Sequence, residues 1–369
     1  MKITQLNPFI LHVPVTGNRI ADSSNRITHW GTVGVIVETD AGLRGFGYTG
    51  TLGYGPADRL IRDCIADCYA PILLGKDPLG VRHLWQTMFN FPGIRWVGRA
   101  GVTQMALAAV DVALWDIKAK AAEMPLWKLL GGSETERIEA YNTDGGWLSL
   151  SDDELVEGAK QMVEGGFRGI KIKIGSPDPG NDLRRIEAVR HAIGADVKLM
   201  VDANACWDLP TAIRVGRRLA DWDVFWFEEP ICCDDVSGHA TLVRSTDTAV
   251  ALGEQLYSVD AFRHFIEAGA VHFVQPDATR LGGVTPCWQA IDLAASHRLP
   301  VVCHAADMMQ IHQHLSIAHP ACTMLEYIPW LRQCFEEPAT VEGGRFLVPQ
   351  MPGAATTLKP DALERFAVS

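Results

Sequence analysis

The chain has 369 residues, of which 47% are hydrophobic and 21% are charged. This length exceeds what one compact core usually serves, so it predicts two domains, and the ordinary composition leaves no long polar tract that would be disordered. The formal net charge of −11 argues against a surface for nucleic acid or an anionic membrane, because both of these partners are themselves negative. A small molecule is therefore the expected partner.

The start of the chain and its cysteines predict the cellular location. The first residues carry Lys2 and a short apolar run that Pro8 and Pro14 interrupt, which is not the pattern of a secretion signal, and no run of eighteen apolar residues follows. The nine cysteines include no CxxC pair and no histidine partner at zinc spacing. We therefore expect a cytoplasmic protein with reduced thiols and no membrane association.

Residues 1–132 are predicted to form a separate N-terminal α+β domain. The runs THWGTVGVIVETD and AGLRGFGYTG are β-rich and flank a Gly-containing turn, which predicts a hairpin. Residues 99–124 carry apolar side chains at helical spacing with little polarity on the other side, so this helix must be buried on most faces. The pair Gly131 and Gly132 then ends the helical region.

From Ile138 onward the chain alternates short apolar runs with amphipathic helices. Eight runs are strand candidates, at 138–143, 169–175, 197–204, 224–230, 249–254, 271–277, 300–305 and 323–328. Continuous apolar strands that alternate with helices predict a parallel sheet covered by helices, and eight of them predict a closed (β/α) barrel over residues 133–340. An open doubly wound sheet is the competing fold. The tail, 341–369, is expected to return to the first domain.

Ionisable side chains close seven of these strands. In chain order they are Lys171 and Lys173, Asp202, Glu228 and Glu229, Glu254, Asp277, His304, and Glu326. The carboxyl ends of barrel strands meet in one ring around the active-site mouth. Any one of these groups could cap a helix or pair with a lysine, but desolvating so many charges together costs several kcal/mol per ion unless a metal or a substrate compensates. The whole set therefore predicts a functional site.

Three carboxylates in this set are separated by one βα repeat each. Asp202 and Glu228 are 26 residues apart, and so are Glu228 and Glu254. Three consecutive strands therefore offer one oxygen ligand apiece, and hard ligands without thiolates suit Mg²⁺, with Mn²⁺ as a substitute.

The motifs KIKIG, VDAN, FEEP, GEQ, QPDATRLGG and CHA, with AAVDVALWD and PLWKLLGG in the first domain, resemble the mandelate racemase branch of the enolase superfamily. The resemblance spans nearly the whole chain. It implies a modified TIM barrel beneath an N-terminal capping domain with lid loops, a symmetric homo-oligomer, and Asp202, Glu228 and Glu254 as the metal ligands. It also implies that Lys173 and His304 are acid/base groups on opposite faces of the substrate.

The implied reaction begins with removal of a proton beside a substrate carboxylate. Such a proton is too weakly acidic for a side-chain base until a cation binds the developing charge. Lys173 must be neutral to act as a base, and Lys171 is expected to lower its pKa by like-charge repulsion. Asp277 is expected to hold one nitrogen of His304 so that the other faces the substrate. By resemblance, Glu326 donates a hydrogen bond to the substrate if it is protonated.

Further polar residues are expected to bind the substrate. Asn204 is expected to support a substrate oxygen or the metal. Residues 18–30 and 49–58 are polar, Gly-containing loops, and by resemblance they close over the barrel mouth. Their candidate substrate-binding side chains are Arg19, Asn25, Arg26, His29 and Tyr54. An ordinary solvated loop is the alternative for each of them.

Other features have plainer interpretations. His312 and His314 are two residues apart in a predicted helix and point to different faces, so we interpret them as packing or surface residues and not as a second metal site. Gly282 and Gly283 could cradle an anion at the start of a helix, and helix packing explains them equally well. Trp226 is more typical of a barrel core than of a pocket wall.

Two acid/base groups permit two outcomes. Return of the proton to the other face gives a racemase or epimerase of a 2-hydroxy acid, whereas protonation of a leaving β-hydroxyl gives a dehydratase that forms a 2-keto-3-deoxy acid. The polar lid favours a polyhydroxylated sugar acid, an aldonate or an aldarate, and hence the dehydratase. A non-catalytic metal-binding member would be expected to lack Lys173 or His304. A lactone-forming cycloisomerase would use other acid/base groups than Asp277 with His304.

Overall fold

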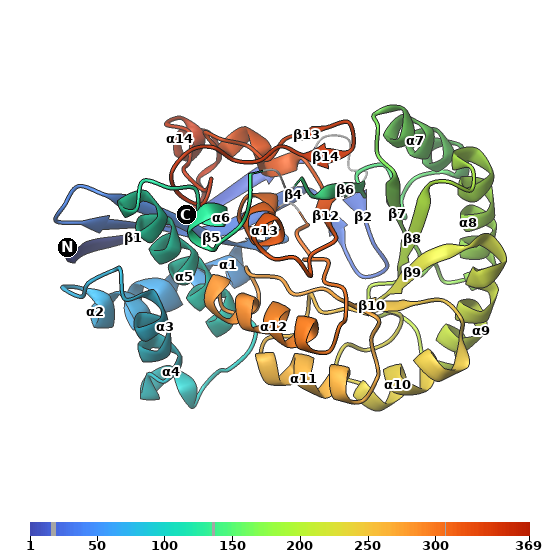
Figure 1. Ribbon diagram of the computed structural model, residues 1–369, viewed down its shortest axis with the longest axis horizontal. Helices are drawn as coiled ribbons and strands as arrows, with labels where there is room; N and C mark the ends of the chain where they lie inside the picture. The colour runs from blue at the N-terminus through green and yellow to red at the C-terminus, as the bar shows by residue number, and fades with distance from the viewer. Residues whose placement is uncertain (16–19, 135–136, 307) are drawn as a thin grey trace.

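The computed structural model describes residues 1–15, 20–134, 137–306 and 308–369. It contains an N-terminal unit built on an antiparallel sheet and a (β/α) barrel, which lie side by side in Figure 1. None of the helices within these described ranges is long and apolar enough to cross a membrane.

The N-terminal sheet has the strand order β1-β4-β5, with β1 at Ile3–Pro14, β4 at His29–Thr39 and β5 at Arg44–Thr51. The pairing of β4 with β5 is antiparallel, which confirms the predicted hairpin. A second, two-stranded hairpin is formed by β2 (Ile20–Ala21) and β3 (Arg26–Ile27). In Figure 1 the hairpin with β2 reaches from the N-terminal unit toward β7 of the barrel, and the hydrogen bond from Ser23 Oγ to the carbonyl of Ala203, at 2.9 Å, joins the two.

Helices cover one face of this sheet. They are α1 (Gly55–Asp63), a π-helical segment (Cys64–Tyr69), α2 (Ala70–Leu73), α3 (Val81–Phe89), α4 (Pro92–Arg95), α5 (Val102–Ala121) and α6 (Leu126–Leu129). α5 is buried on most faces, as its apolar composition predicts. It lies directly on β5, because a Cβ atom at Gly45 or Gly47 would collide with the α5 backbone. Two glycines thus permit the close approach of helix and sheet.

The barrel strands follow one another in parallel. They are β6 (Glu139–Asn142), β7 (Gly169–Lys173), β8 (Lys198–Asp202), β9 (Val224–Glu228), β10 (Val250–Leu252), β11 (Phe273–Val274) and β12 (Met324–Tyr327). The sheet closes because β12 pairs with β6, and Val301 bridges Val274 on one side and Cys322 on the other. The closed barrel is confirmed and the open sheet is wrong. The seventh predicted strand, 300–305, is reduced to these bridges at Val301.

The helices of the barrel form its outer ring (Figure 1). They are α7 (Asp152–Glu164), α8 (Pro179–Ile193), α9 (Leu209–Leu219), a 3₁₀ turn (Ala220–Trp222), α10 (Val236–Ser245), α11 (Val259–Glu267), α12 (Val284–Ser296) and α13 (Met309–Ala318). The barrel interior holds a buried cluster of five strand residues, Tyr141, Met200, Trp226, Ala251 and Met324, together with Val302. Trp226 is therefore a core residue, and the barrel is a packed body that presents its functional groups only at its ends.

The C-terminal tail contacts both units. A hairpin of β13 (Val341–Glu342) and β14 (Arg345–Phe346) adds to the barrel edge at β6, after a 3₁₀ turn at Trp330–Cys334. Beyond it, Gly353 bridges Pro125, and the chain passes through α14 (Ala362–Phe366) to a bridge with β1. The end of the chain thus lies against the N-terminal unit.

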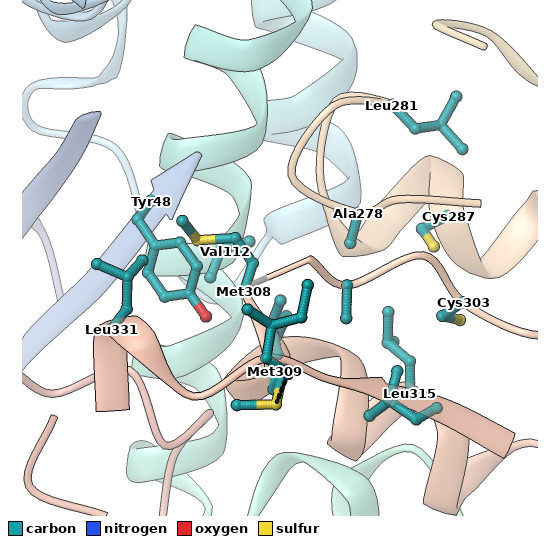
Figure 2. Close-up of a cluster of buried hydrophobic side chains, with 14 of the residues drawn as sticks. Tyr48, Val112, Ala278, Leu281, Cys287, Cys303, Met308, Met309, Leu315 and Leu331 are labelled. Atoms are coloured by element: carbon teal, nitrogen blue, oxygen red, sulfur yellow. Dashed lines mark hydrogen bonds between the residues drawn. The ribbon is translucent and has the colours of Figure 1, made fainter. Parts of the chain in front are cut away.

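One hydrophobic core runs through the junction between the two units. Figure 2 shows Tyr48 of β5 and Val112 of α5 beside Ala278, Met308 and Leu315 of the barrel, all of them buried. The barrel mouth is therefore built against a fixed wall of the N-terminal unit.

The pair Gly282 and Gly283 belongs to this junction. Gly283 has a φ of 111°, and a Cβ atom there would collide with the carboxylate of Asp111 on α5. Asp111 is fully buried and accepts hydrogen bonds from the backbone nitrogen and the hydroxyl of Thr285, at 2.9 and 2.8 Å. The place at the start of α12 where an anion could bind is taken by this carboxylate, so the packing interpretation is right.

Candidate active site

A cavity of about 680 Å³ lies between the carboxyl ends of the barrel strands and the N-terminal unit. The barrel contributes a ring of ionisable and polar side chains to its wall, namely Lys173, Asn204, Glu254, Asp277, Arg280, His304 and Glu326. The N-terminal unit contributes polar groups from its loops, together with apolar side chains such as Trp30 and Met105. Five of the strand-end residues that the sequence singles out therefore line one cavity, and Lys171, Asp202, Glu228 and Glu229 are not part of its wall.

Strand register explains why the first of these groups are neighbours. Lys173 on β7 is the pairing partner of Asp202 on β8, and Asp202 is in turn the partner of Glu228 on β9. Glu228 pairs with Ala251 on β10, and Glu254 follows three residues later, above the last paired residue of that strand. The lysine and three carboxylates thus form a short row along the barrel rim.

The three carboxylates can hold one metal ion. One oxygen from each of Asp202, Glu228 and Glu254 lies within 4.8 Å of the others, and all three side chains are buried. Glu228 is oriented by the side chains of Trp226 and Gln275, each of which donates a hydrogen bond of 2.9 Å to Oε2. An all-oxygen set of this kind fits Mg²⁺, as predicted, because hard cations prefer carboxylate ligands.

Lys171 neutralises the middle of this row. Its Nζ atom lies 2.7 Å from Glu228 Oε1, 2.9 Å from Glu326 Oε1 and 3.8 Å from Asp202 Oδ2. Burial lowers the pKa of Lys171, but the attraction of Glu228 and Glu326 outweighs it and holds the pKa well above the ordinary value of a lysine. Lys171 is thus a permanent cation within the cluster.

Lys173 forms a buried ion pair in which Nζ donates to Asp202 Oδ2. Burial lowers the pKa of Lys173, the charge of Asp202 raises it, and Lys171 lowers it, with a net rise above the ordinary value. Lys171 lowers the pKa of Lys173, as expected. The effect does not make Lys173 neutral here, because the attraction of Asp202 raises the pKa by more than Lys171 lowers it. For Lys173 to act as a base, as predicted, Asp202 would have to be engaged elsewhere.

His304 lies between two carboxylates at the other end of the row. Its Nδ1 is 2.8 Å from Asp277 Oδ2, which is the predicted pair, and its Nε2 is 2.8 Å from Glu254 Oε2. Burial lowers the pKa of His304, but the charges of Glu254 and Asp277 raise it to about 10. The imidazole is therefore an imidazolium in this arrangement, with Nε2 on the side of the cavity.

Glu326 is surrounded by hydrogen-bond donors. It accepts hydrogen bonds from Thr143 Oγ1 at 2.7 Å and from the backbone nitrogen of Ala306 at 3.0 Å, besides its contact with Lys171. Burial raises its pKa, but Lys171 and His304 lower it, and the net value is about 2. Glu326 thus accepts hydrogen bonds as a carboxylate in this arrangement, and the expectation that it donates one to the substrate when protonated stays a prediction.

The backbone after β8 and β9 is strained. Asn204, Ala205 and Glu229 have φ values of 47°, 60° and 39°, in the left-handed region that side chains disfavour, at a cost of about 1–3 kcal/mol each. The backbone nitrogen of Ala205 donates to the carbonyl of Glu229 at 2.7 Å, and that of Asn204 donates to Asp202 Oδ1 at 2.9 Å. Asn204 lines the cavity, and its turn also holds the Asp202 carboxylate in place.

The loop candidates divide into two groups. Asn25 and Tyr54 line the cavity, and Tyr54 is 67% exposed at its edge. Arg26 and His29 are exposed and are not part of the cavity wall, which makes them ordinary solvated residues in this arrangement. Arg19 lies outside the described residues.

Sequence reasoning named Glu229 as a strand-end group but gave it no role, and it missed Arg280. Arg280 donates from Nη1 to Glu254 Oε1 at 2.8 Å and has Nε 3.6 Å from Asp277 Oδ2, so it joins the metal-binding row to the His304 pair. Glu229 is buried beside the row, and burial together with Glu254 and Asp202 raises its pKa well above the ordinary value. Arg280 lies in the motif QPDATRLGG and Glu229 in FEEP. A strand-end pattern alone does not indicate which residues of a motif point toward the site.

Comparisons with known proteins agree with this architecture. Residues 9–131 match the family model of the mandelate racemase / muconate lactonizing enzyme N-terminal domain, and residues 154–362 match the model described as enolase C-terminal domain-like. The chain is 41% identical over 290 residues to L-talarate/galactarate dehydratase of Salmonella typhimurium LT2, an alignment that covers 79% of this chain and 72% of that protein.

Two further proteins are similar over greater lengths. The 3,6-anhydro-alpha-L-galactonate cycloisomerase of Streptomyces coelicolor is 34% identical over 95% of both chains. The crystal structure of the Salmonella dehydratase liganded with Mg and L-lyxarohydroxamate superposes with a TM-score of 0.92 at 34% identity, and covers 100% of this chain and 93% of that chain. The similarity thus includes both the barrel and the N-terminal unit.

Proposed function

We propose, from the premise that this chain belongs to the mandelate racemase / muconate lactonizing enzyme family of the enolase superfamily, that it is a Mg²⁺-dependent sugar-acid dehydratase. The substrate class is an aldonate or an aldarate. The reaction removes the proton on the carbon beside the carboxylate and expels the β-hydroxyl, and the product is a 2-keto-3-deoxy acid. The Salmonella relative, whose name states a dehydratase of two such acids, supports this choice.

One observation carries the proposal. The outer carboxylates of the metal-binding row are the partners of the two acid/base groups, since Asp202 pairs with Lys173 and Glu254 pairs with His304. Lys173, Glu254 and His304 line the same cavity. A substrate carboxylate held at the row would therefore have its α-carbon within reach of a lysine on one side and of a histidine on the other.

The chemistry follows from the protein groups. Asp202, Glu228 and Glu254 would hold the Mg²⁺, which when bound supplies positive charge beside the substrate carboxylate and lowers the cost of removing the α-proton. A carboxylate that binds a cation attracts a neighbouring ammonium group less. With Asp202 bound to the metal, Lys173 would therefore lose part of the negative charge that raises its pKa. Lys171 then lowers the pKa of Lys173 without opposition from a free Asp202.

In the dehydration, Lys173 takes the α-proton, and the electron pair of the broken C–H bond remains on the substrate as an enediolate. His304, which carries a proton and is held by Asp277, gives that proton to the β-oxygen. The C–O bond breaks and water leaves. The resulting enol takes up a proton at C3 to become the keto acid. Asn25 and Tyr54, with Ser24, line the distal part of the cavity and would bind the remaining hydroxyls.

A screen tests the proposal directly. The enzyme with Mg²⁺ is incubated with a library of sugar mono- and diacids, and 2-keto acid formation is measured with semicarbazide. Lys173→Met and His304→Asn are expected to lower turnover by about 10²–10⁴-fold, the contribution of a positioned acid or base. Lys198→Met is the matched control, because Lys198 lies in the same barrel but pairs with Glu139 away from the cavity.

The same assay in D₂O separates the alternatives. Exchange of the α-proton without keto acid would favour a racemase or epimerase that uses the same lysine and histidine. A cyclic product without keto acid would favour cycloisomerisation. If no acid yields keto acid and none exchanges its α-proton, the chain is a non-catalytic metal-binding protein and the proposal is lost.

A further inference from the structure

The Asp277 carboxylate lies between two imidazoles, and the reaction described above uses only one of them. Oδ2 of Asp277 contacts His304 at 2.8 Å, whereas Oδ1 lies 3.2 Å from Nε2 of His312 on α13. Oδ1 also accepts hydrogen bonds of 2.7 Å from the backbone nitrogen and the hydroxyl of Thr279. His312 is therefore neither a surface residue nor a simple packing residue.

The hydrogen bonds of His312 define the orientation of its ring. Nδ1 is 2.7 Å from the carbonyl oxygen of Met308, and a carbonyl oxygen only accepts, so Nδ1 is the donor. Nε2 then faces the backbone N–H of Ala278 at 3.0 Å and Asp277 Oδ1 at 3.2 Å. A neutral ring accepts from Ala278, and a protonated ring donates to Asp277. His312 therefore holds the Ala278 backbone when its ring is neutral and the Asp277 carboxylate when its ring is protonated, so in either state it holds one of these two adjacent residues.

The contact between His312 and residues 277 and 278 is buried, although Asp277 also reaches the wall of the cavity. His312 is 0% exposed, Asp277 is 2% exposed, and Ala278 is 0% exposed. Figure 2 shows Ala278, Cys303 and Met308 in the buried hydrophobic cluster at this place. Removal of the imidazole would leave the Ala278 N–H and the Met308 carbonyl buried without their present partner. Because an unsatisfied buried polar group is costly, the backbone at Ala278 is expected to move.

A neighbouring histidine on the same helix has no such contact. His314 is also 0% exposed, and its Nδ1 accepts from the backbone nitrogen of Trp127 at 3.1 Å. Trp127 belongs to α6, so this hydrogen bond joins α13 to the N-terminal unit and does not involve Asp277 or His304. The two histidines thus share burial and helix but differ in what they hold.

We propose that His312 is a positioning residue for the Asp277–His304 pair, because its imidazole holds the Ala278 backbone or, when protonated, the adjacent Asp277 carboxylate, and thereby directs Nε2 of His304 toward the substrate. The proposal rests on the proposed function, in which His304 and Lys173 act from opposite faces of the substrate. It follows that loss of His312 impairs only the face that His304 serves.

The test compares the two faces separately. A 3-deoxyhexonate lacks the β-hydroxyl and cannot dehydrate, so exchange of its α-proton with D₂O is the one reaction left. NMR measures this exchange for both C2 epimers, with the Mg²⁺-loaded enzyme. His304→Asn and Lys173→Met first assign each epimer to the base that serves it. His312→Phe removes both hydrogen bonds of the ring, His312→Gln keeps a polar group near the position of Nε2, and His314→Phe is the matched control.

The expected result is selective. His312→Phe slows exchange of the epimer served by His304 by about ten- to a hundredfold, the size of effect that outer partners of a functional imidazole have at metal sites. Exchange of the epimer served by Lys173 stays within about twofold of the wild-type enzyme, a change of about 0.4 kcal/mol. His312→Gln recovers part of the loss, and His314→Phe leaves the ratio of the two rates unchanged. Equal slowing of both epimers, or an unchanged ratio, overturns the proposal.

A second measurement does not need turnover. In protein labelled with ¹⁵N-histidine, the signals of His304 are identified by their loss in His304→Asn. They are expected to shift in His312→Phe and to stay in place in His314→Phe, and unshifted His304 signals in His312→Phe would also overturn the proposal. Failure of the proposed function is distinct: a wild-type enzyme that exchanges neither epimer removes the dehydratase, and the ¹⁵N spectrum then decides the positioning role by itself.

Discussion

Lys171→Met replaces the buried ammonium group at the centre of the carboxylate row by a neutral side chain of similar length. Lys171 Nζ is the nearest cation to both Glu228 and Glu326, at 2.7 and 2.9 Å, and all three side chains are at most 2% exposed. The substitution therefore leaves two carboxylates in a site that water does not reach. Lys173 and His304 remain nearby, but Lys173 is already paired with Asp202, and His304 with Glu254 and Asp277.

The structure sets the size of the effect. Removal of one partner of a buried ion pair costs about 3–5 kcal/mol, because the other charge stays buried without compensation. Domains of ordinary stability have about 5–15 kcal/mol in total, so the loss is a large fraction of it. Lys198→Met is the control, since Lys198 lies on β8 and pairs with Glu139 at 2.9 Å, but the two side chains are 35% and 25% exposed. A pair of that kind contributes at most about 1 kcal/mol.

Guanidinium unfolding in EDTA, followed by far-UV circular dichroism, measures both variants. Lys171→Met is expected to lose at least three times as much free energy of unfolding as Lys198→Met. Excess Mg²⁺ is expected to restore part of the loss in Lys171→Met, because a cation at the row replaces the missing charge. If the two lysine variants lose the same amount in EDTA, the carboxylate row does not depend on Lys171 and the charge balance described here is wrong.

Three other predictions concern the metal, the imidazole and the junction of the two units. Glu254→Gln removes one anionic ligand and is expected to weaken Mg²⁺ binding more than tenfold by titration calorimetry, a change of over about 1.4 kcal/mol, while Glu139→Gln leaves it unchanged. Burial lowers the pKa of His304, but Glu254 and Asp277 raise it from 6.5 to about 10, so the stability that His304 contributes is present below pH 6.5 and is lost as the pH rises toward 10. The free energy of unfolding in EDTA should show this dependence on pH. The same dependence in a His304→Gln protein would contradict the assignment. Asp111→Ala leaves two buried donors of Thr285 without an acceptor and is expected to cost about 2–5 kcal/mol in a thermal melt, whereas an unaltered melting temperature would mean that α12 does not need this anchor.

Several elements of this protein could be predicted from residue patterns because their causes are local. The hairpin of β4 and β5 follows from β-rich runs around a short turn, and the burial of α5 follows from apolar side chains all around the helix. The barrel follows from the repetition of apolar strands and helices. Since every parallel strand ends at the same rim, the spacing of 26 residues was sufficient to bring Asp202, Glu228 and Glu254 together.

Other features depend on how separate elements pack and therefore had no periodic signal. The pKa of Lys173 depends on the short contact with Asp202 against the more distant Lys171, and the ionisation of Glu326 depends on a lysine from another strand. Whether a loop residue reaches the cavity depends on the docking of the N-terminal unit, which brings in Asn25 and Tyr54.

The amino-acid sequence by itself predicted the barrel and three carboxylates that can hold a metal, because strand periodicity places these groups at one rim, whereas the acid/base candidates came from the resemblance to the family. Only the tertiary structure showed the contacts of Lys173 with Asp202 and of Glu326 with Lys171, which set the direction of their pKa shifts, and the place of His312 behind Asp277. The physical reason is distance: strand spacing sets which residues share a rim, whereas charge and hydrogen bonding depend on side-chain positions within a few ångströms, and those arise only when α13, the strands and the N-terminal unit pack together.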